Sequence, residues 1–331
     1  MVVDQAQEEL VSEQLLVSDQ LLVEKPVGEN STPHPSQRNE VKRSREVNDR
    51  SWLAKLELRF EKRPRGTRLT RNRHVGPLYV QKPFYPEGDE LAHVYLLHPP
   101  GGLVSGDDLR IQIDAQENTA ALMTTPGAAR IYRARDDQPL QRQTVKLKVG
   151  ANASLEWFPL ETIVYNKAHV ELDTEVHLSD DSKFMGWEIN CFGLPAGNAP
   201  FNAGSFQQRY QIFRRGRPLF VDRFSISNRN RERILSGLAG MQGHAVNGFF
   251  LAGPCNMDTE AVCLTLEKLR QIADEMQLSD SVAITKNSEF IIGRYLGGSA
   301  EQARKIFTEW WKVLRPITLR RQACPPRIWA T

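Results

Sequence analysis

Cysteine is scarce in this sequence, and the few cysteines stand far apart. Only Cys191, Cys255, Cys263 and Cys324 occur in 331 residues, and no two of them form a CxxC pair. A dense disulfide framework of the kind found in small secreted domains is therefore excluded. Free thiols in a reducing compartment are the simpler interpretation, so we predict a cytoplasmic protein.

Long apolar runs are also missing. The run Gly248–Gly253 suits a buried strand and is far shorter than the roughly 20 residues that span a bilayer. Residues 1–9 are acidic, and no charged region followed by an apolar stretch marks a secretory signal. We therefore expect a soluble protein with no membrane partner.

Neither charge nor motif points to an enzyme. Lys and Arg number 43 against 40 Asp and Glu, and a net charge of +3 favours no nucleic-acid partner. The GxxxxGK(S/T) phosphate loop, the GxSxG nucleophile elbow and the HExxH zinc motif are absent. Histidines number only seven, and His93 and His98 have no familiar ligand spacing. We predict no catalytic residues and no tightly bound cofactor.

What the sequence does contain is alternation with a period of two. Leu56, Leu58 and Phe60 alternate with charged residues, which predicts a strand with one buried and one wet face. The pattern returns at residues 109–113, 145–149 and 170–176, and in a predicted hairpin formed by 210–213 and 219–221. From about residue 51 to about 250 the chain is typical of an all-β body without a convincing helical period. The predicted fold class is mainly β.

Residues from about 251 to 331 differ, because a helical period appears there. Asp258 or Thr259 is placed to cap a helix with apolar positions on one face over residues 262–276. Ser299 opens a capping box for a second helix, and we expect Pro316 to end that helix. Two short strands are predicted between the helices, at 282–285 and 290–292. This part is predicted to be a small two-helix α+β appendix of the β body.

Residues 1–50 stand apart from the rest. The sequence VSEQLL at 11–16 is almost repeated by VSDQLL at 17–22, and a polar stretch with prolines follows. A period that occurs twice is too short for a repeat architecture, which needs about three units. We predict a disordered N-terminal tail. The alternative is a short amphipathic helix that docks a partner.

Three carboxylates, Glu161, Glu188 and Asp222, lie in the β-rich part. Two of them facing each other about 5 to 10 Å apart would suit a glycosidase, so a carbohydrate-active β enzyme is an alternative. Spacing alone favours solvent-facing strand carboxylates. Glu188 is the exception, because it stands in the strongly apolar segment 184–192, where an acid is either on a wet face or buried for a reason.

One loop has an unusual composition, His98-Pro99-Pro100-Gly101-Gly102. Prolines and glycines together impose a specific backbone path, and a rigid turn between strands is the plain interpretation.

Two further segments are candidate contact surfaces. Small residues at 124–129 precede Arg130, Tyr132 and Arg133, which predicts a surface for a partner. The basic cluster between Arg59 and Arg73 would suit RNA phosphates, so an RNA-binding β module is a third reading. No stacking aromatics are interleaved with these arginines, which favours a solvated strand edge.

Many short segments follow one another in a characteristic order between about Trp52 and Thr331. They are His74–Leu78, Gln81–Pro86, Tyr95–Gly102, Gly106-Asp107, Thr125–Ala128, Tyr132-Arg133, Leu155–Pro159 and Pro326–Trp329. None of them is diagnostic alone, but their order and spacing together resemble the UreD family of urease accessory proteins, called UreH in some organisms.

The resemblance implies a helical arrangement of β-strands with two C-terminal helices. It implies a scaffold without its own catalysis, whose partners are UreF, the GTPase UreG and the urease apoenzyme, with no nucleic acid. In that system UreE brings nickel and UreG hydrolyses GTP, so that nickel reaches the dinuclear site of urease.

The resemblance also implies an internal path for nickel in transit, and we predict that Asp107, Glu188 and Asp222 line it. Family positions in these strands carry acidic residues linked to transit. Nitrogen and sulfur ligands hold nickel strongly, whereas carboxylate, carbonyl and water hold it weakly. A passage with oxygen donors and few histidines would therefore release the ion instead of storing it.

Overall fold

Two large β-sheets make up most of the protein. The computed structural model describes residues 52–137 and 139–330, and the tail predicted at residues 1–50 lies outside this part. A seven-stranded sheet contains β1 (Trp52–Arg63), β2 (Gly66–Val75), β6 (Asp107–Ala115), β9 (Gln141–Val149), β12 (His169–Leu178), β15 (Ser205–Arg214) and β16 (Arg217–Ile226). The main strands of a twelve-stranded sheet are β3 (Tyr79–Val80), β4 (Leu91–Leu97), β7 (Ala120–Thr124), β10 (Ser154–Phe158), β13 (Lys183–Leu194), β17 (Val246–Gly253), β18 (Val282–Asn287) and β19 (Phe290–Gly297). Its short strands are β5 (Gly102–Leu103), β8 (Ala129–Ile131), β11 (Thr162–Val164) and β14 (Ala199–Pro200). The mainly β prediction is confirmed.

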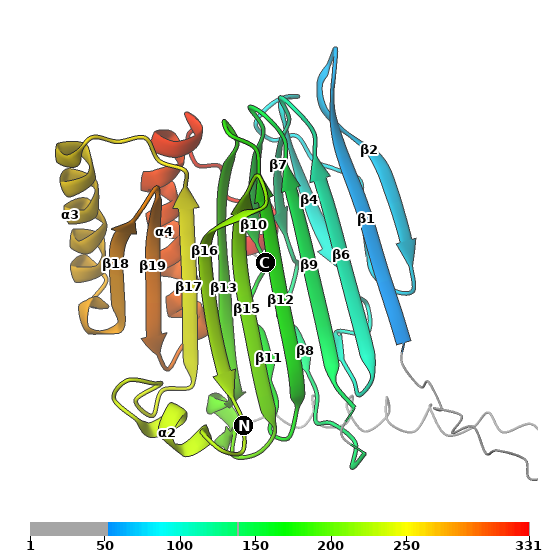
Figure 1. Ribbon diagram of the computed structural model, residues 1–331, viewed down its shortest axis with the longest axis vertical. Helices are drawn as coiled ribbons and strands as arrows, with labels where there is room; N and C mark the ends of the chain where they lie inside the picture. Colours follow the sequence, from blue (N-terminus) through cyan, green and yellow to red (C-terminus); the bar gives the residue numbers. More distant parts are fainter. Residues whose placement is uncertain (1–51, 138, 331) are drawn as a thin grey trace, which may run out of the picture. The chain divides into compact units, whose positions relative to one another are not determined.

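Between β4 and β15 the chain winds in successive coils. Each coil places a strand in the twelve-stranded sheet, then a short strand, then a strand in the seven-stranded sheet, as in β4–β5–β6 and β7–β8–β9 (Figure 1). Neighbouring coils pair in parallel, so Leu91, Ala120, Ser154 and Lys183 occupy equivalent positions in four consecutive coils. The two sheets therefore face each other across one interior.

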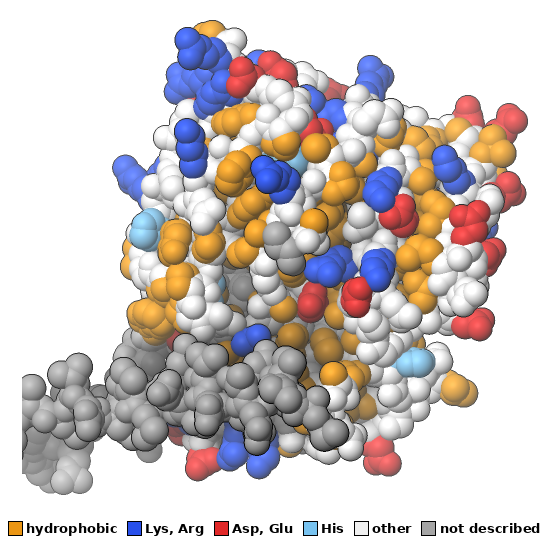
Figure 2. All heavy atoms as spheres, turned by 180° about the vertical axis from the view of Figure 1, so that it is seen from behind, with side chains coloured by type: hydrophobic (Ala, Val, Ile, Leu, Met, Phe, Trp, Pro, Cys, Tyr) orange, Lys and Arg blue, Asp and Glu red, His pale blue; other side chains and the backbone are white. Residues whose placement is uncertain are grey.

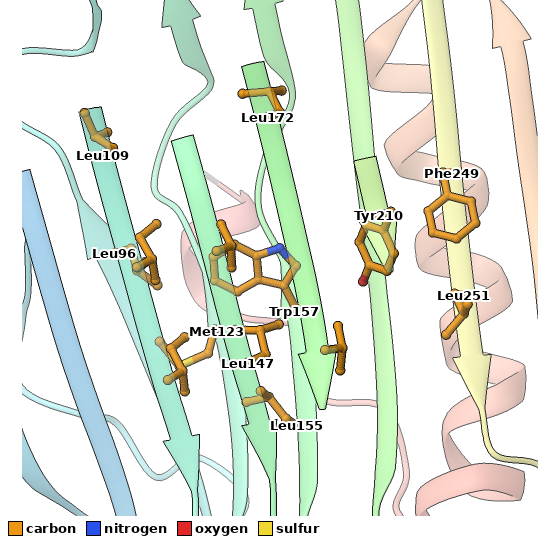
Figure 3. Close-up of a cluster of buried hydrophobic side chains, with 14 of the residues drawn as sticks. Leu96, Leu109, Met123, Leu147, Leu155, Trp157, Leu172, Tyr210, Phe249 and Leu251 are labelled. Carbon is orange, nitrogen blue, oxygen red and sulfur yellow. The ribbon is translucent and has the colours of Figure 1, made fainter. Parts of the chain in front are cut away.

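Alternation along the strands fills two separate cores. Leu56, Leu58 and Phe60 of β1 are buried between the two sheets, as the sequence predicts. Figure 3 shows this layer, in which Trp157 of β10 lies among leucines and Tyr210 of β15 faces Phe249 of β17. The opposite face of the twelve-stranded sheet packs against helices through a second, aromatic-rich cluster.

The helices gather at the C-terminal end of the sequence. They are α2 (Arg231–Ser236), α3 (Thr259–Glu275) and α4 (Ala300–Leu319), with short 3-10 turns at Pro195–Gly197, Ser279–Ser281 and Arg327–Ala330. The carboxylate of Asp258 accepts a hydrogen bond from the Ala261 amide at 2.8 Å and caps α3, as predicted. Among the sheet strands, α4 contacts β17, β13 and β19, and α3 contacts β18 (Figure 1).

The start and the end of α4 depart from expectation. Ser299 accepts from the Gln302 amide at 3.3 Å, but the Gln302 side chain accepts from the Tyr295 hydroxyl at 3.2 Å, so the reciprocal half of the capping box is not made. The prediction that Pro316 ends the helix is wrong, because α4 continues to Leu319. Pro316 lies in the last turn, where its carbonyl accepts a hydrogen bond from the Arg320 amide at 3.1 Å, and buried Thr318 packs that turn against the protein.

The C-terminal strands continue the main sheet. β17 pairs with β13 in antiparallel fashion, and β19 and β18 follow in order, so the α+β part shares a sheet with the coils. The helix α2 lies in the part that was expected to have no helix, and its six residues are too few to show a period. None of the helices in the described ranges is long and apolar enough to cross a membrane.

Candidate functional site

A cavity of about 210 Å³ lies between the two sheets. Its walls are largely apolar, with Leu96, Leu103 and Ile111 among them. The polar side chains in the wall come from loops and from neighbouring strands, namely His98, Thr125, Gln143, Thr162, Thr174, Glu188 and Asn190. An apolar chamber with a few convergent polar groups is the usual form of a binding site.

Glu188 supplies the single carboxylate among the described residues that line this cavity. Alternation along β13 turns Trp187 toward the helices and Glu188 toward the space between the sheets. The Glu188 side chain is half-buried, because its carboxyl borders the cavity. Protein atoms nevertheless surround the carboxyl beyond the cavity and desolvate it. The apolar segment around Glu188 therefore contains an acid that points inward.

Neutral groups hold the Glu188 carboxyl. The Thr174 hydroxyl donates to Glu188 Oε1 at 2.6 Å, and the Gln208 side-chain amide donates to Oε2. Asn190 Nδ2 in turn donates to Gln208 Oε1 at 2.9 Å and to Asn247 Oδ1 at 3.1 Å. These residues lie on β12, β13, β15 and β17, so the polar cluster joins the two sheets.

No cation compensates this carboxylate. Across residues 52–137 and 139–330, no Lys, Arg or His forms an ion pair with Glu188. Burial raises the pKa of the Glu188 carboxyl from 4.5 to about 7, because desolvation outweighs the hydrogen bonds from Thr174 and Gln208. The carboxylates of Asp222 and Asp173 raise the pKa further. The group is therefore poised to gain or lose a proton, or to take up a cation, near neutral pH.

The other two acids predicted to line a nickel path lie outside the cavity wall. Asp222 of β16 forms a bidentate ion pair with Arg294 of β19, at 2.6 and 3.0 Å, and Arg294 also lies 4.8 Å from the centre of the Phe249 ring. Asp107 is buried and accepts a hydrogen bond from the Val104 amide at 2.8 Å. The structure therefore places Glu188 on the cavity wall, Asp222 in an ion pair between the sheets, and Asp107 at the first position of β6.

The motif loop brings a histidine to the same cavity. His98 and Gly101 both line it, and the Gly101 amide donates to the His98 carbonyl at 2.8 Å, in a turn where Gly101 has a positive φ of 71°. Gly102 is required by close packing, since a Cβ there would lie 2.5 Å from the Arg130 carbonyl oxygen. Desolvation lowers the pKa of His98, although Asp107 opposes this, so its ring stays neutral at pH 7.

The segment of Arg130, Tyr132 and Arg133 lies near the surface. Arg130 and Arg133 are exposed, and the Tyr132 ring lies 5.4 Å from that of Tyr165. Arg133 lies 3.8 Å from Asp136. The exposure suits a contact surface, and that assignment stays a prediction.

The basic cluster between Arg59 and Arg73 is largely neutralised. Its ion pairs are Arg59–Asp114, Lys62–Glu90, Arg63–Glu61, Arg68–Asp89 and Arg71–Glu57. Figure 2 shows Lys and Arg side chains gathered at the end of the molecule that carries the β1–β2 hairpin, with acids beside them. Arginines that are already paired are poor phosphate ligands, which weakens the RNA-binding alternative.

A two-carboxylate cleft is not formed at this cavity either. Glu161 and Asp222, which were considered with Glu188 as an acid–base pair, are not part of its wall. Among the described residues, no group of three or more His, Cys, Asp or Glu side chains converges to hold a metal ion. The described residues therefore offer neither a pair of facing carboxylates at this cavity nor a cluster of several metal ligands.

Sequence reasoning missed a buried ionic cluster on the other face of the sheet. Arg315 of α4 donates to Glu156 Oε2 at 2.9 Å and to Glu87 Oε2 at 2.7 Å, and Trp311 Nε1 donates to Glu156 Oε1 at 2.6 Å. His93 Nε2 lies 2.7 Å from Glu87 Oε1. A signal was present in the sequence, since Arg315 follows the apolar stripe of α4 and Glu156 stands within an apolar strand.

The charges in this cluster compensate one another in part, because desolvation still raises the pKa of Glu156 in spite of its contacts with Arg315 and Trp311. Desolvation would lower the pKa of Arg315, but the hydrogen bonds and charges of Glu87 and Glu156 raise it. Desolvation also raises the pKa of Glu87, yet hydrogen bonds from His93 and Arg315 outweigh it and the pKa is lowered. The cluster ties α4 to β10 and to the turn before β4, which is a structural role.

Comparison with known proteins identifies the family of this chain. Residues 53–330 match the family model described as "UreD urease accessory protein". The chain is 43% identical to "Urease accessory protein UreD" of Marinomonas sp. (strain MWYL1) over 290 residues, which cover 86% of this chain and 92% of the relative. It is 40% identical to the UreD of Psychromonas ingrahamii over 293 residues, 85% of this chain and 94% of the relative. "Urease accessory protein UreD 2" of Brucella anthropi is 39% identical over 280 residues, 85% and 98% of the two chains. The chain therefore belongs to the UreD family of urease accessory proteins.

Proposed function

We propose that this chain is a non-catalytic maturation factor that works in the cytoplasm with UreF and UreG. In this role it binds the urease apoenzyme and assists the insertion of nickel into the dinuclear site of urease. Nickel passes through the chain in transit, along a path that includes the cavity at Glu188. The UreD family membership supports the role in urease maturation.

The observation that carries the nickel path is a carboxylate without a cation partner on the wall of a cavity between the two sheets. Burying an acid without a counter-ion is costly, so folding alone does not favour Glu188 at this place. Thr174 and Gln208 fix the carboxyl but leave its negative charge uncompensated. A passing divalent cation would supply that compensation.

The composition of the cavity wall favours passage over storage. Glu188 and His98 are its charged or metal-binding side chains, and the other polar groups are amides and hydroxyls. Oxygen donors of this kind bind nickel weakly, and tight sites need several nitrogen or sulfur ligands in a fixed geometry. A carrier that must release its ion benefits from such a wall.

The test is to co-express the urease subunits with the full accessory set and to compare Glu188→Gln with the unmodified chain. We expect several-fold less nickel per urease and several-fold less urea hydrolysis, because the amide removes the charge and keeps the shape. The matched control is Glu171→Gln, since Glu171 is a strand acid on β12 that pairs with Arg142 at 2.7 Å and does not line the cavity.

Co-purification with UreF separates the two explanations of a loss. The nickel path predicts that the Glu188→Gln variant still binds UreF. Normal activation of urease by this variant would refute the path. A variant that no longer assembles with UreF would show that Glu188 is structural.

A further inference from the structure

The buried ionic cluster of Arg315, Glu156, Glu87 and His93 has one more acid than it has permanent cations. Arg315 pairs with Glu87 at 2.7 Å and with Glu156 at 2.9 Å, and none of the described residues offers a second Lys or Arg to either acid. The side chains of Arg315 and His93 are 0% exposed, that of Glu156 is 1% exposed and that of Glu87 is 11% exposed. With both acids ionised and His93 neutral, one negative charge would stay uncompensated away from water, which is costly.

A proton would cancel this charge, and the hydrogen bonds decide where it can sit. Glu156 Oε1 accepts from Trp311 Nε1 at 2.6 Å and from Arg315 Nε at 3.0 Å, and Glu156 Oε2 accepts from Arg315 Nη2 at 2.9 Å. Indole and guanidinium nitrogens only donate, so a hydroxyl on either oxygen would face donors and find no acceptor. Desolvation raises the pKa of Glu156, but a proton there would break the hydrogen bonds from α4.

The Glu87 carboxylate is occupied in the same way. Its Oε2 accepts from Arg315 Nη1 at 2.7 Å, and its Oε1 accepts from Arg315 Nη2 at 2.8 Å. Desolvation would raise the pKa of Glu87, but the hydrogen bonds from His93 and Arg315 lower it, so Glu87 is ionised at pH 7. Cys324 is a further titratable group beside the cluster, and burial raises the pKa of its thiol, so the thiol is neutral and adds no charge.

The His93 ring is the position that remains for the proton. Its Nε2 lies 2.7 Å from Glu87 Oε1, and an ionised carboxylate only accepts, so Nε2 carries a hydrogen in either charge state of the ring. The charge therefore depends on Nδ1, which is buried and has no hydrogen-bond partner among residues 52–137 and 139–330. An N–H at Nδ1 forgoes one hydrogen bond, which costs less than an uncompensated charge in the interior. This difference favours the imidazolium form of His93.

The cluster also fastens the C-terminal part of the chain to the sheet. Arg315 lies on α4, and its Nη1 donates to the carbonyl of Gln322, beyond the end of that helix. Further along, Trp329 Nε1 donates to Thr124 Oγ1 of β7 at 2.9 Å. The acids and the histidine of the cluster come from β4, from the turn before it and from β10. Loss of charge balance would therefore loosen α4 and the segment 320–330 together.

We propose that a protonated His93 is the second cation of this cluster and makes it a pH-sensitive latch for α4 and the segment 320–330. When the proton leaves, one negative charge stays buried without compensation and the latch weakens. The latch is thus strongest at low pH and loses strength as pH rises. The use of the latch rests on the proposed function: urea hydrolysis releases ammonia and raises pH, so active urease would loosen the accessory protein that assisted its maturation.

Nitrogen-15 NMR of the histidine rings in the full chain tests the protonation directly. The two ring nitrogens of a neutral imidazole differ widely in chemical shift, whereas those of an imidazolium lie close together. The signals of His93 are identified by their loss in the His93→Gln variant. We expect the imidazolium pattern for His93 at pH 7. A neutral pattern at this pH would overturn the inference.

Removal of one acid tests the charge balance itself. In Glu156→Gln, Arg315 and Glu87 compensate each other, so we expect the His93 signals to change to the neutral pattern at pH 7. The control Glu171→Gln removes a partly exposed strand acid that pairs with Arg142, and it should leave the imidazolium pattern unchanged. An imidazolium that persists in a folded Glu156→Gln variant would overturn the inference. If this variant does not fold, the pattern of the unmodified chain still decides.

Hydrogen exchange measures the latch. After correction for base catalysis, the protection of amides in α4 and in the segment 320–330 should fall from pH 6 to 9, by at most about tenfold per pH unit because one proton is linked. His93→Gln should already show the lower protection at pH 6. The control His177→Gln removes a histidine that is 43% exposed and should keep the pH dependence of the unmodified chain. Protection in the unmodified chain that does not change with pH would overturn the latch.

These experiments use the purified chain without urease, so their failure differs from failure of the proposed function. A neutral His93 in a chain that loads urease normally overturns the latch and leaves the maturation role standing. An imidazolium His93 in a chain that does not support urease activation supports the latch and overturns the maturation role.

Discussion

Glu156 and Glu188 are two interior glutamates on adjacent strands of one sheet, and they are held in opposite ways. Glu156 on β10 points toward α4, is 1% exposed, and is bound by Arg315 and Trp311. Glu188 on β13 points between the sheets, has only Thr174 and Gln208 as partners, and borders a cavity. A buried acid with a fixed cation partner maintains the fold, whereas the proposed nickel path depends on an acid that has no cation partner.

The sheet face on which each acid lies explains the contrast. The helix face of the twelve-stranded sheet is covered by α4, which brings Arg315 to Glu156. The inner face of the same sheet meets another sheet whose inward side chains are mostly apolar, so a cation is not supplied there.

The largest effect is expected at Arg315. Replacing Arg315 by Met leaves Glu156 and Glu87 buried without their cation, and breaking a buried pair in this way costs about 3–5 kcal/mol. Urea denaturation of the purified chain measures the loss in unfolding free energy. The control Arg142→Met removes a partly exposed pair with Glu171 and should cost no more than about 1 kcal/mol. A loss at Arg315 as small as the control would mean that the ionic cluster is not structural.

Local patterns predicted much of this architecture. The alternation in β1, β6, β9 and β12 predicted the right buried faces, and the cap of α3 at Asp258 is one of the two neighbouring residues that the sequence indicated. Strand order was not predictable, because parallel pairing of β4, β7, β10 and β13 depends on contacts between distant coils. Glu156 and Arg315 are likewise 159 positions apart, and nothing in either segment identifies the other.

The site was predicted only in part, for a similar reason. Glu188 stood out because an acid in an apolar strand is unusual, and the structure places it on a cavity wall. Whether such an acid has a cation partner depends on the side chains of other strands and helices, which a single segment does not reveal.

A smaller effect is expected from pH at Glu188. The folded pKa of about 7 lies above the ordinary value of 4.5 for this carboxyl, so the folded chain holds this proton more tightly than the unfolded chain. The stability that Glu188 contributes is therefore present below about pH 4.5 and is lost as pH rises through 7. Relative to the unmodified chain, the Glu188→Gln variant should gain stability between pH 5 and 8, by at most about 3 kcal/mol.

Denaturation curves at several pH values measure this difference. The upper limit applies to a fully desolvated carboxyl, and water in the cavity would reduce the gain. The control Glu171→Gln should show no comparable rise over the same interval. A difference between Glu188→Gln and the unmodified chain that stays constant from pH 5 to 8 would contradict the raised pKa.

The smallest effect is expected at two similar ion pairs near the edge of the sheets. Arg294 pairs with Asp222 and Arg214 pairs with Glu289, each through two hydrogen bonds of 2.6 to 3.0 Å. Both pairs are partly exposed, so Arg294→Gln and Arg214→Gln should each cost no more than about 1 kcal/mol of unfolding free energy.

Function should nevertheless distinguish these two variants. Asp222 acts electrostatically on Glu188, and removal of Arg294 leaves that negative charge uncompensated and favours the protonated form of Glu188. Nickel per urease should therefore fall modestly with Arg294→Gln, by less than with Glu188→Gln, and stay unchanged with Arg214→Gln. Equal nickel content of urease with both arginine variants would show that the Arg294–Asp222 pair does not influence the charge of Glu188. The proposed path would then involve the cavity and not this ion pair.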